Sequence, residues 1–119
     1  MEKTDAVTAL SALAQDNRLD VFRLLVQAGP EGMPAGAVAA TLGLAPNTLT
    51  FHFDRLREAG LVTVRREGRS MIYSARFDTM NALLGFLTDN CCDGRPERCR
   101  PAPQGALRRA GMSRKERVS

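Results

Sequence analysis

The chain has 119 residues, of which 44% are hydrophobic and 25% are charged, and its formal net charge is +4. This length fits one domain and is too short for a typical two-domain enzyme. No apolar run approaches the roughly 20 residues that a membrane span needs. The first ten residues also lack the apolar segment of a secretory signal. We therefore expect a cytoplasmic protein with no membrane partner.

The positive charge is concentrated at one end of the sequence. Residues 1–90 carry nine basic and ten acidic side chains, whereas residues 91–119 carry eight basic and three acidic ones. A basic protein often binds nucleic acid, because phosphates attract Lys and Arg. Here the excess lies in a tail, so the folded part has to present its own basic face if it binds DNA.

Apolar spacing and turn residues predict five helices and one hairpin. In chain order we expect a helix over 4–14, a second helix that Asp16 caps and that ends at Gly29, a third over Ala35–Leu42 and a fourth over 46–59. Two strands follow, over 61–65 and 71–75, with a glycine-containing loop over 66–70 between them. A last helix is capped by Asp78 and ends near Asp89. From Asp93 onward Gly, Pro and Arg dominate and apolar periodicity is lost. The pattern predicts a folded domain over 1–90 and a basic, cysteine-containing, partly disordered tail over 91–119.

This order of elements predicts a mainly α fold with a β-hairpin wing, the winged helix-turn-helix. In that fold the second helix of the motif places its first side chains on base edges in the major groove. The corresponding helix here, 46–59, would bury Leu49, Phe53 and Leu56 and expose Asn47, Thr48, Thr50, Phe51 and His52. Asn pairs with adenine, while Thr and aromatic groups contact bases, phosphates or thymine methyls.

Basic side chains further along the same region suit contacts with the DNA backbone. They are Arg55 on the helix and Arg65, Arg66 and Arg69 on the hairpin. The alternatives are that the hairpin arginines are simply solvated and that His52 is a surface or capping residue.

The stretch from Leu42 to Val62, LGLAPNTLTFHFDRLREAGLV, resembles the signature of the ArsR/SmtB family of metal-responsive repressors. ALAQDNRL, which ends at Leu19, resembles the entry to the family's second helix, and EGR, which ends at Arg69, resembles its wing together with Tyr73. The resemblance covers about residues 7–88. It implies a homodimer that represses without metal and leaves its operator DNA when metal binds.

Apolar stripes on the first and last helices are where we expect the two copies to pair. The stripes contain Val7, Leu10 and Leu13, and Met80, Leu84 and Leu87. Two departures from the family are visible. Ala45 and Thr50 stand where the family often has Ser, and residues 36–42 lack the paired cysteines that several members carry in the third helix.

Three cysteines lie within nine residues: Cys91, Cys92 and Cys99. Their odd number argues against a disulfide framework, and soft thiolates select soft ions. Three thiols without a convenient fourth ligand suit the pyramidal, three-coordinate complexes of trivalent arsenic or antimony better than tetrahedral zinc. Nearby arginines, Arg95, Arg98 and Arg100, favour the thiolate form.

The two adjacent cysteines constrain where such a site can form. Neighbouring side chains on a helix point about 100° apart, so the chain must leave the helix for both sulfurs to converge. Asp93 and Gly94 supply that break, which predicts a site at the end of the last helix and within one chain, with a site across the dimer as the alternative. Other interpretations are a redox disulfide between Cys99 and one of the pair, zinc with Asp89 or Asp93, and thiols without a role.

The family resemblance favours arsenic, because some arsenic-responsive members carry their ligands near the end of this helix. We therefore predict a transcriptional repressor that needs no cofactor to bind double-stranded operator DNA and that trivalent arsenic, or antimony, releases. An enzyme is not expected, since no histidine accompanies the cysteines. A winged helix without a sensing role is the remaining alternative.

Overall fold

The computed structural model describes residues 1–98. The chain divides after Leu87, and the two units are described separately. The first unit contains α1 (Lys3–Leu13), α2 (Asp16–Ala28), β1 (Met33–Pro34), α3 (Ala35–Leu42), α4 (Pro46–Glu58), β2 (Val62–Glu67), β3 (Ser70–Ala75) and α5 (Phe77–Leu87). The predicted helical fold with a hairpin wing is confirmed, and the short strand β1 was not predicted.

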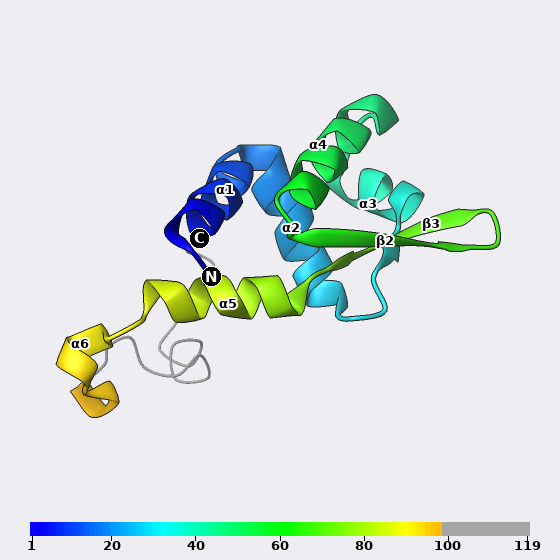
Figure 1. The fold of residues 1–119 in the computed structure, drawn as a ribbon. Coiled ribbons are helices and arrows are strands. Elements are labelled where there is room, and N and C mark those ends of the chain that lie inside the picture. The colour runs from blue at the N-terminus through cyan, green and yellow to red at the C-terminus, as the bar shows by residue number, and fades with distance from the viewer. Residues whose placement is uncertain (99–119) are drawn as a thin grey trace. The chain divides into compact units, whose positions relative to one another are not determined.

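The three strands form one antiparallel sheet in the order β1-β3-β2. β2 pairs with β3 from Val62↔Ala75 to Glu67↔Ser70. This register leaves only Gly68 and Arg69 in the loop, so the predicted five-residue loop is wrong. Gly68 has φ +60°, as the first position of a two-residue type II′ loop requires. The hairpin projects from the unit on the side away from α1 (Figure 1).

The strand β1 depends on a glycine that lets two chain segments approach closely. β1 pairs with β3 through Met33↔Tyr73 and Pro34↔Ile72. Gly32, directly before it, has φ +74°, and a Cβ built there would collide with the backbone carbonyl oxygen of Tyr73. Only glycine combines this backbone conformation with this approach.

The core lies around α2, which packs against α1, α3, α4 and β3. Leu49, Phe53 and Leu56 are buried on α4, as predicted. The ring of Phe53 stacks on that of Tyr73 in β3, with centroids 3.6 Å apart and planes 3° from parallel. This stack fixes α4 to the sheet from which the wing extends.

Helix ends differ from the prediction at three places. Gln15, not Asp16, is the N-cap of α2, and its side chain accepts a hydrogen bond from the backbone N–H of Arg18 at 2.9 Å. α5 begins at Phe77, so Asp78 lies inside its first turn, where its carboxylate accepts a hydrogen bond from Arg76 at 2.9 Å. α5 also ends at Leu87, two residues earlier than expected.

The second unit is described over residues 88–98 and contains α6 (Cys91–Gly94) and the 3-10 turn η1 (Pro96–Arg98). Cys99 and Arg100 lie outside the described residues. Within residues 1–98, no helix is both long enough and apolar enough to span a membrane.

Candidate DNA-binding surface and cysteine turn

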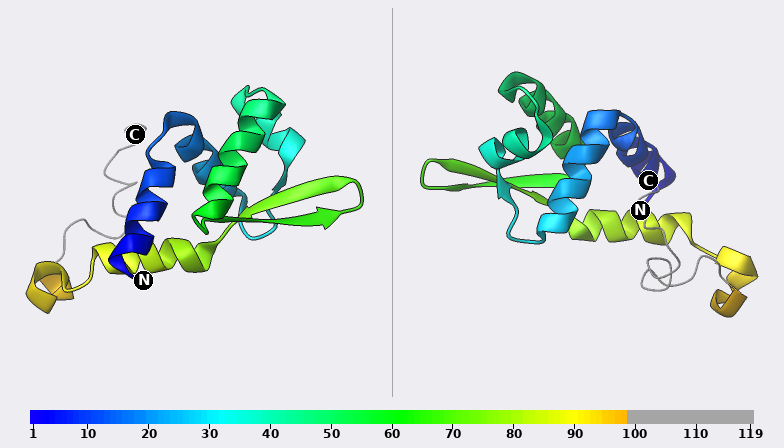
Figure 2. Two further views of the ribbon diagram at one scale, coloured as in Figure 1. Left: turned by 45° about the horizontal axis from the view of Figure 1, so that its top comes forward. Right: turned by 180° about the vertical axis from the view of Figure 1, so that it is seen from behind.

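α3 and α4 form the helix-turn-helix pair. α3 ends where Gly43 adopts the left-handed conformation, with φ +67°. The chain then turns, and α4 begins with Pro46 in its first turn after the N-cap Ala45, which has no side chain to cap the helix. The two helices lie side by side, with the hairpin extending beyond them (Figure 2). This is the arrangement that a winged helix uses to enter the major groove.

The first half of α4 exposes uncharged side chains. They are Asn47, Thr48, Thr50 and Phe51. The hydroxyl of Thr50 donates a hydrogen bond to the Pro46 carbonyl oxygen at 3.0 Å, so its donor is used within the helix. The Phe51 side chain is large and 50% exposed. Amide, hydroxyl and aromatic groups of this kind can meet base edges and thymine methyls.

The second half of α4 is charged, and its charges pair with one another. Arg55 lies 3.6 Å from Glu58, and Arg57 lies 3.8 Å from Asp54. Exposed pairs of this spacing contribute little to stability. They do place a carboxylate beside each arginine near the end of the helix.

His52 is buried, so the prediction that α4 exposes it is wrong. Its side chain is 5% exposed, and its Nδ1 lies 3.5 Å from Nη1 of Arg18. Burial and the positive charge of Arg18 both lower the pKa of His52. Sequence reasoning did not single out Arg18, although it lies in the stretch before Leu19 that resembles the family.

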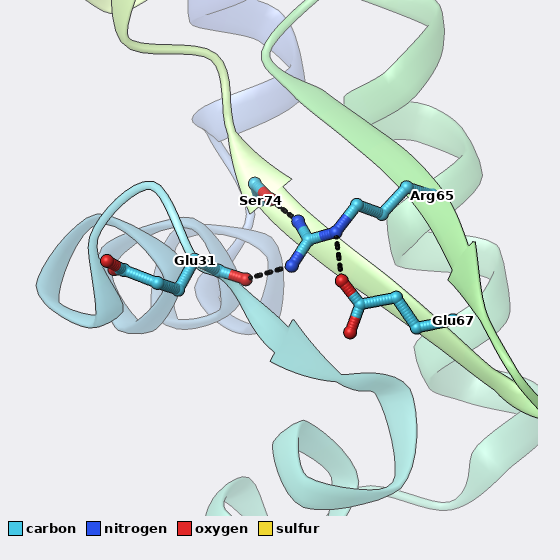
Figure 3. A network of polar contacts seen from close by, with 4 residues as sticks. All are labelled: Glu31, Arg65, Glu67 and Ser74. Atoms are coloured by element: carbon cyan, nitrogen blue, oxygen red, sulfur yellow. Dashed lines mark hydrogen bonds and ion pairs between the residues drawn. The ribbon is translucent and has the colours of Figure 1, made fainter.

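The wing carries three arginines that differ in their surroundings. Arg66 and Arg69 are exposed, and Arg66 donates to the nearby Gly68 carbonyl oxygen at 3.3 Å. Arg65 donates to the Glu67 carboxylate at 2.7 Å, to the Glu31 carbonyl oxygen at 2.8 Å and to the Ser74 hydroxyl at 3.4 Å (Figure 3). Arg65 therefore joins the base of the wing to the loop before β1.

The second unit brings two of the three cysteines together. Cys91 and Cys92 follow α5 outside its regular helix, as expected, and their Sγ atoms lie 3.4 Å apart. The turn that does this has left-handed conformations at Asn90, Cys92 and Asp93, with φ from 54° to 58°. Within the described part of the chain, no three His, Cys, Asp or Glu side chains are placed to hold a metal ion. Cys99 lies outside that part.

A helix-turn-helix domain family matches residues 13–65. The chain is 38% identical over 80 residues to the nodulation protein NolR of Rhizobium meliloti, a match that covers 67% of this chain and 63% of NolR. The chain therefore spans slightly less than two thirds of NolR. It is 38% identical over 77 residues to the transcriptional regulator YceK of Bacillus subtilis, covering 64% of this chain and 76% of YceK.

A third relative carries the name of an arsenical resistance operon repressor of Halobacterium salinarum, with 35% identity over 80 residues that cover 67% of this chain and 66% of the relative. Among solved structures, HlyU from Vibrio cholerae has a TM-score of 0.59 and 30% identity over 73% of this chain and 97% of its own. A Mycobacterium bovis domain described as homodimeric and as a possible ArsR-family regulator has a TM-score of 0.59 and 26% identity, over 77% of this chain and 85% of its own.

YceK and the Halobacterium salinarum relative are named as transcriptional regulators and not as enzymes, and the Mycobacterium bovis domain is described as a winged helix-turn-helix like the one above. The chain belongs to the ArsR/SmtB family of winged helix-turn-helix DNA-binding transcriptional regulators.

Proposed function

We propose that the chain is a dimeric repressor that reads its operator with the first half of α4 and grips the DNA backbone with its wing. The observation that carries this proposal is that one unit exposes both an uncharged first half of α4 and two arginines on the wing. Asn47, Thr48 and Phe51 would contact bases, and Arg66 and Arg69 would contact phosphates. His52 and Arg65 are left out, because one is buried and the other is bonded within the protein. A regulator that acts on the chromosome would be cytoplasmic.

A second copy of the chain is the partner that the apolar surface of α1 and α5 fits. Val7 and Leu10 on α1 and Leu84 and Leu87 on α5 are each at least 42% exposed, and the two helices pack against each other. Leu13 and Met80, which were expected on the same stripes, instead pack against the core. An exposed apolar surface on a monomer marks an interaction site, and the homodimeric description of the Mycobacterium bovis domain supports self-association.

We further propose that trivalent arsenic, or antimony, is the inducer and that it binds Cys91, Cys92 and Cys99. The 3.4 Å separation of the first two sulfurs supports this ligand. The contact places both thiols where one ion can bind them together. The choice of arsenic over zinc rests on the three-thiol ligand set, which suits a three-coordinate ion better than tetrahedral zinc.

Operator release separates the candidate inducers. Operator fragments selected from genomic DNA would be bound to the full chain under reducing conditions, and release would be followed by fluorescence anisotropy with arsenite, antimonite, zinc and peroxide in parallel. Arsenite should release the wild type. Serine variants of each cysteine should bind the operator equally well but respond to arsenite at least about fivefold less, the low end of usual coupling between two sites.

Asp93→Asn is the matched control, because it lies in the same turn and keeps all three thiols. It should respond to arsenite like the wild type. If zinc releases the wild type from the operator and Asp93→Asn no longer responds to zinc, the inducer is zinc and not arsenic. Release by peroxide alone would indicate a redox sensor. Unaltered arsenite release from all three serine variants would place the inducer site elsewhere.

A further inference from the structure

Arg18 connects three helices through one side chain. It lies in the first turn of α2, where its backbone N–H is capped by Gln15. Its Nε donates to the Ala12 carbonyl oxygen at the end of α1 at 2.7 Å. On the other side its Nη1 lies 3.5 Å from Nδ1 of His52 in α4, and its Cζ lies 6.0 Å from the centroid of the Phe51 ring.

These contacts replace the acidic partner that a half-buried arginine usually has. None of the ion pairs in residues 1–98 involves Arg18. Its guanidinium group is instead held by a carbonyl oxygen and an imidazole. For Nδ1 of His52 to accept from a guanidinium group, the ring must be neutral and carry its proton on Nε2.

The surroundings favour that neutral form. Arg18 and His52 line an open groove of about 550 Å³ between α1, α2 and α4. α1 contributes no titratable group to it, only Thr8, Ser11 and Ala12, and the other charged groups, Arg55 and Glu58, pair with each other. Burial, and then the Arg18 charge, lower the pKa of His52.

We propose that Arg18 is a positioning residue that sets the orientation of the reading helix α4 relative to α1, through the contact between Arg18 and His52. The inference rests on the proposed function of α4 as the reading helix. α1 would be part of the dimer surface, so a shift at the end of α1 moves the Ala12 carbonyl, Arg18 and then the buried face of α4. A change in how the two subunits pair would in this way change the position of the side chains that contact bases.

Within residues 1–98, α1 and α4 are otherwise joined by side-chain packing, which tolerates small rotations better than a directional hydrogen bond does. His52 and Phe51 are neighbours in α4, with ring centroids 5.6 Å apart. A rotation that breaks the Arg18 contact would therefore also turn Phe51, which lies in the exposed first half of the helix.

The test compares Arg18→Gln with a control that removes the same charge from the same helix, Arg23→Gln, whose side chain is exposed. Arg18→Gln should weaken operator binding by about two- to tenfold, the equivalent of one hydrogen bond, with an unchanged salt slope and unchanged affinity for random DNA. Arg23→Gln should bind as the wild type does. A slope that falls by about one unit would make Arg18 a phosphate contact and overturn the proposal.

A second measurement needs no DNA. His52 is the sole histidine of the sequence, so one imidazole proton signal in NMR reports on it. Its pKa should rise in Arg18→Gln and stay unchanged in Arg23→Gln. His52→Asn, which keeps an acceptor near the Nδ1 position, should fold and retain operator affinity. An equal pKa of His52 in the wild type, Arg18→Gln and Arg23→Gln would refute the proposed role of the contact between Arg18 and His52. Equal operator affinity of Arg18→Gln and the wild type would also refute it. Absence of specific DNA binding by the wild type would refute the proposed function itself.

Discussion

Replacing Arg65 by glutamine should lower the free energy of unfolding but leave the salt dependence of DNA binding unchanged. The substitution removes the donors to Glu31, Glu67 and Ser74. The pair with Glu67 is exposed, so it contributes at most about 1 kcal/mol. The 2.8 Å bond to the Glu31 carbonyl contributes about 1 kcal/mol, and the longer contact with Ser74 contributes less. The expected loss is about 1–2 kcal/mol.

A loss of that size corresponds to a fall in Tm of about 5–15 °C for a domain of this length. Circular dichroism would measure it, and Arg69→Gln is the matched comparison because Arg69 lies at the tip of the same hairpin. Arg69→Gln should keep Tm near the wild-type value but lower the salt slope of DNA binding by about one unit. An Arg65→Gln variant with unchanged Tm and a reduced slope would show that Arg65 belongs to the DNA contacts after all.

Three further results are expected. Gly32→Ala should destabilise the fold in urea unfolding by more than about 1 kcal/mol, because of the positive φ and the approach to Tyr73, whereas Gly36→Ala in α3, which has open space around it, should be neutral or stabilising. Stability should fall as the pH drops below about 6.5, since the unfolded His52 then binds a proton that the folded one, with its lowered pKa, resists; a profile unaffected by His52→Asn would contradict this. Leu10→Glu should shift sedimentation at micromolar concentration toward the monomer, while Leu19→Glu, similarly exposed outside the α1 and α5 surface, should not.

The helical spacing of apolar residues predicted the buried face of α4, but it did not predict that His52 lies on that face beside Arg18. Leu49, Phe53 and Leu56 recur at helical spacing, and their burial follows from that spacing alone. His52 lies on the same face, yet a polar residue type suggested exposure. Its buried ring contacts Arg18, which is 34 positions away in the sequence, and no local pattern reports such a contact.

Similar long-range contacts explain the other differences. β1 is two residues long and contains a proline, so it has no period, and it exists only because β3 pairs with it. Arg65 was grouped with Arg66 and Arg69 by charge, but its place in the register brings it beside Ser74 and the Glu31 carbonyl. For the cysteines, the need to leave the helix followed from geometry, whereas the early end of α5 at Leu87 did not.

The paired charges in the second half of α4 bear on how the protein would search a chromosome. A genome offers millions of competing sites to which a regulator binds through phosphates alone. Because a carboxylate lies beside each of Arg55 and Arg57 in their own helix, that helix adds less to such unproductive binding than two unpaired arginines would. In the proposed dimer, the two wings would supply four arginines, whose own contribution to the salt slope is about −3.6. Discrimination by the folded unit would therefore depend on the uncharged first half of α4, whose base contacts are lost at wrong sites while the phosphate contacts remain.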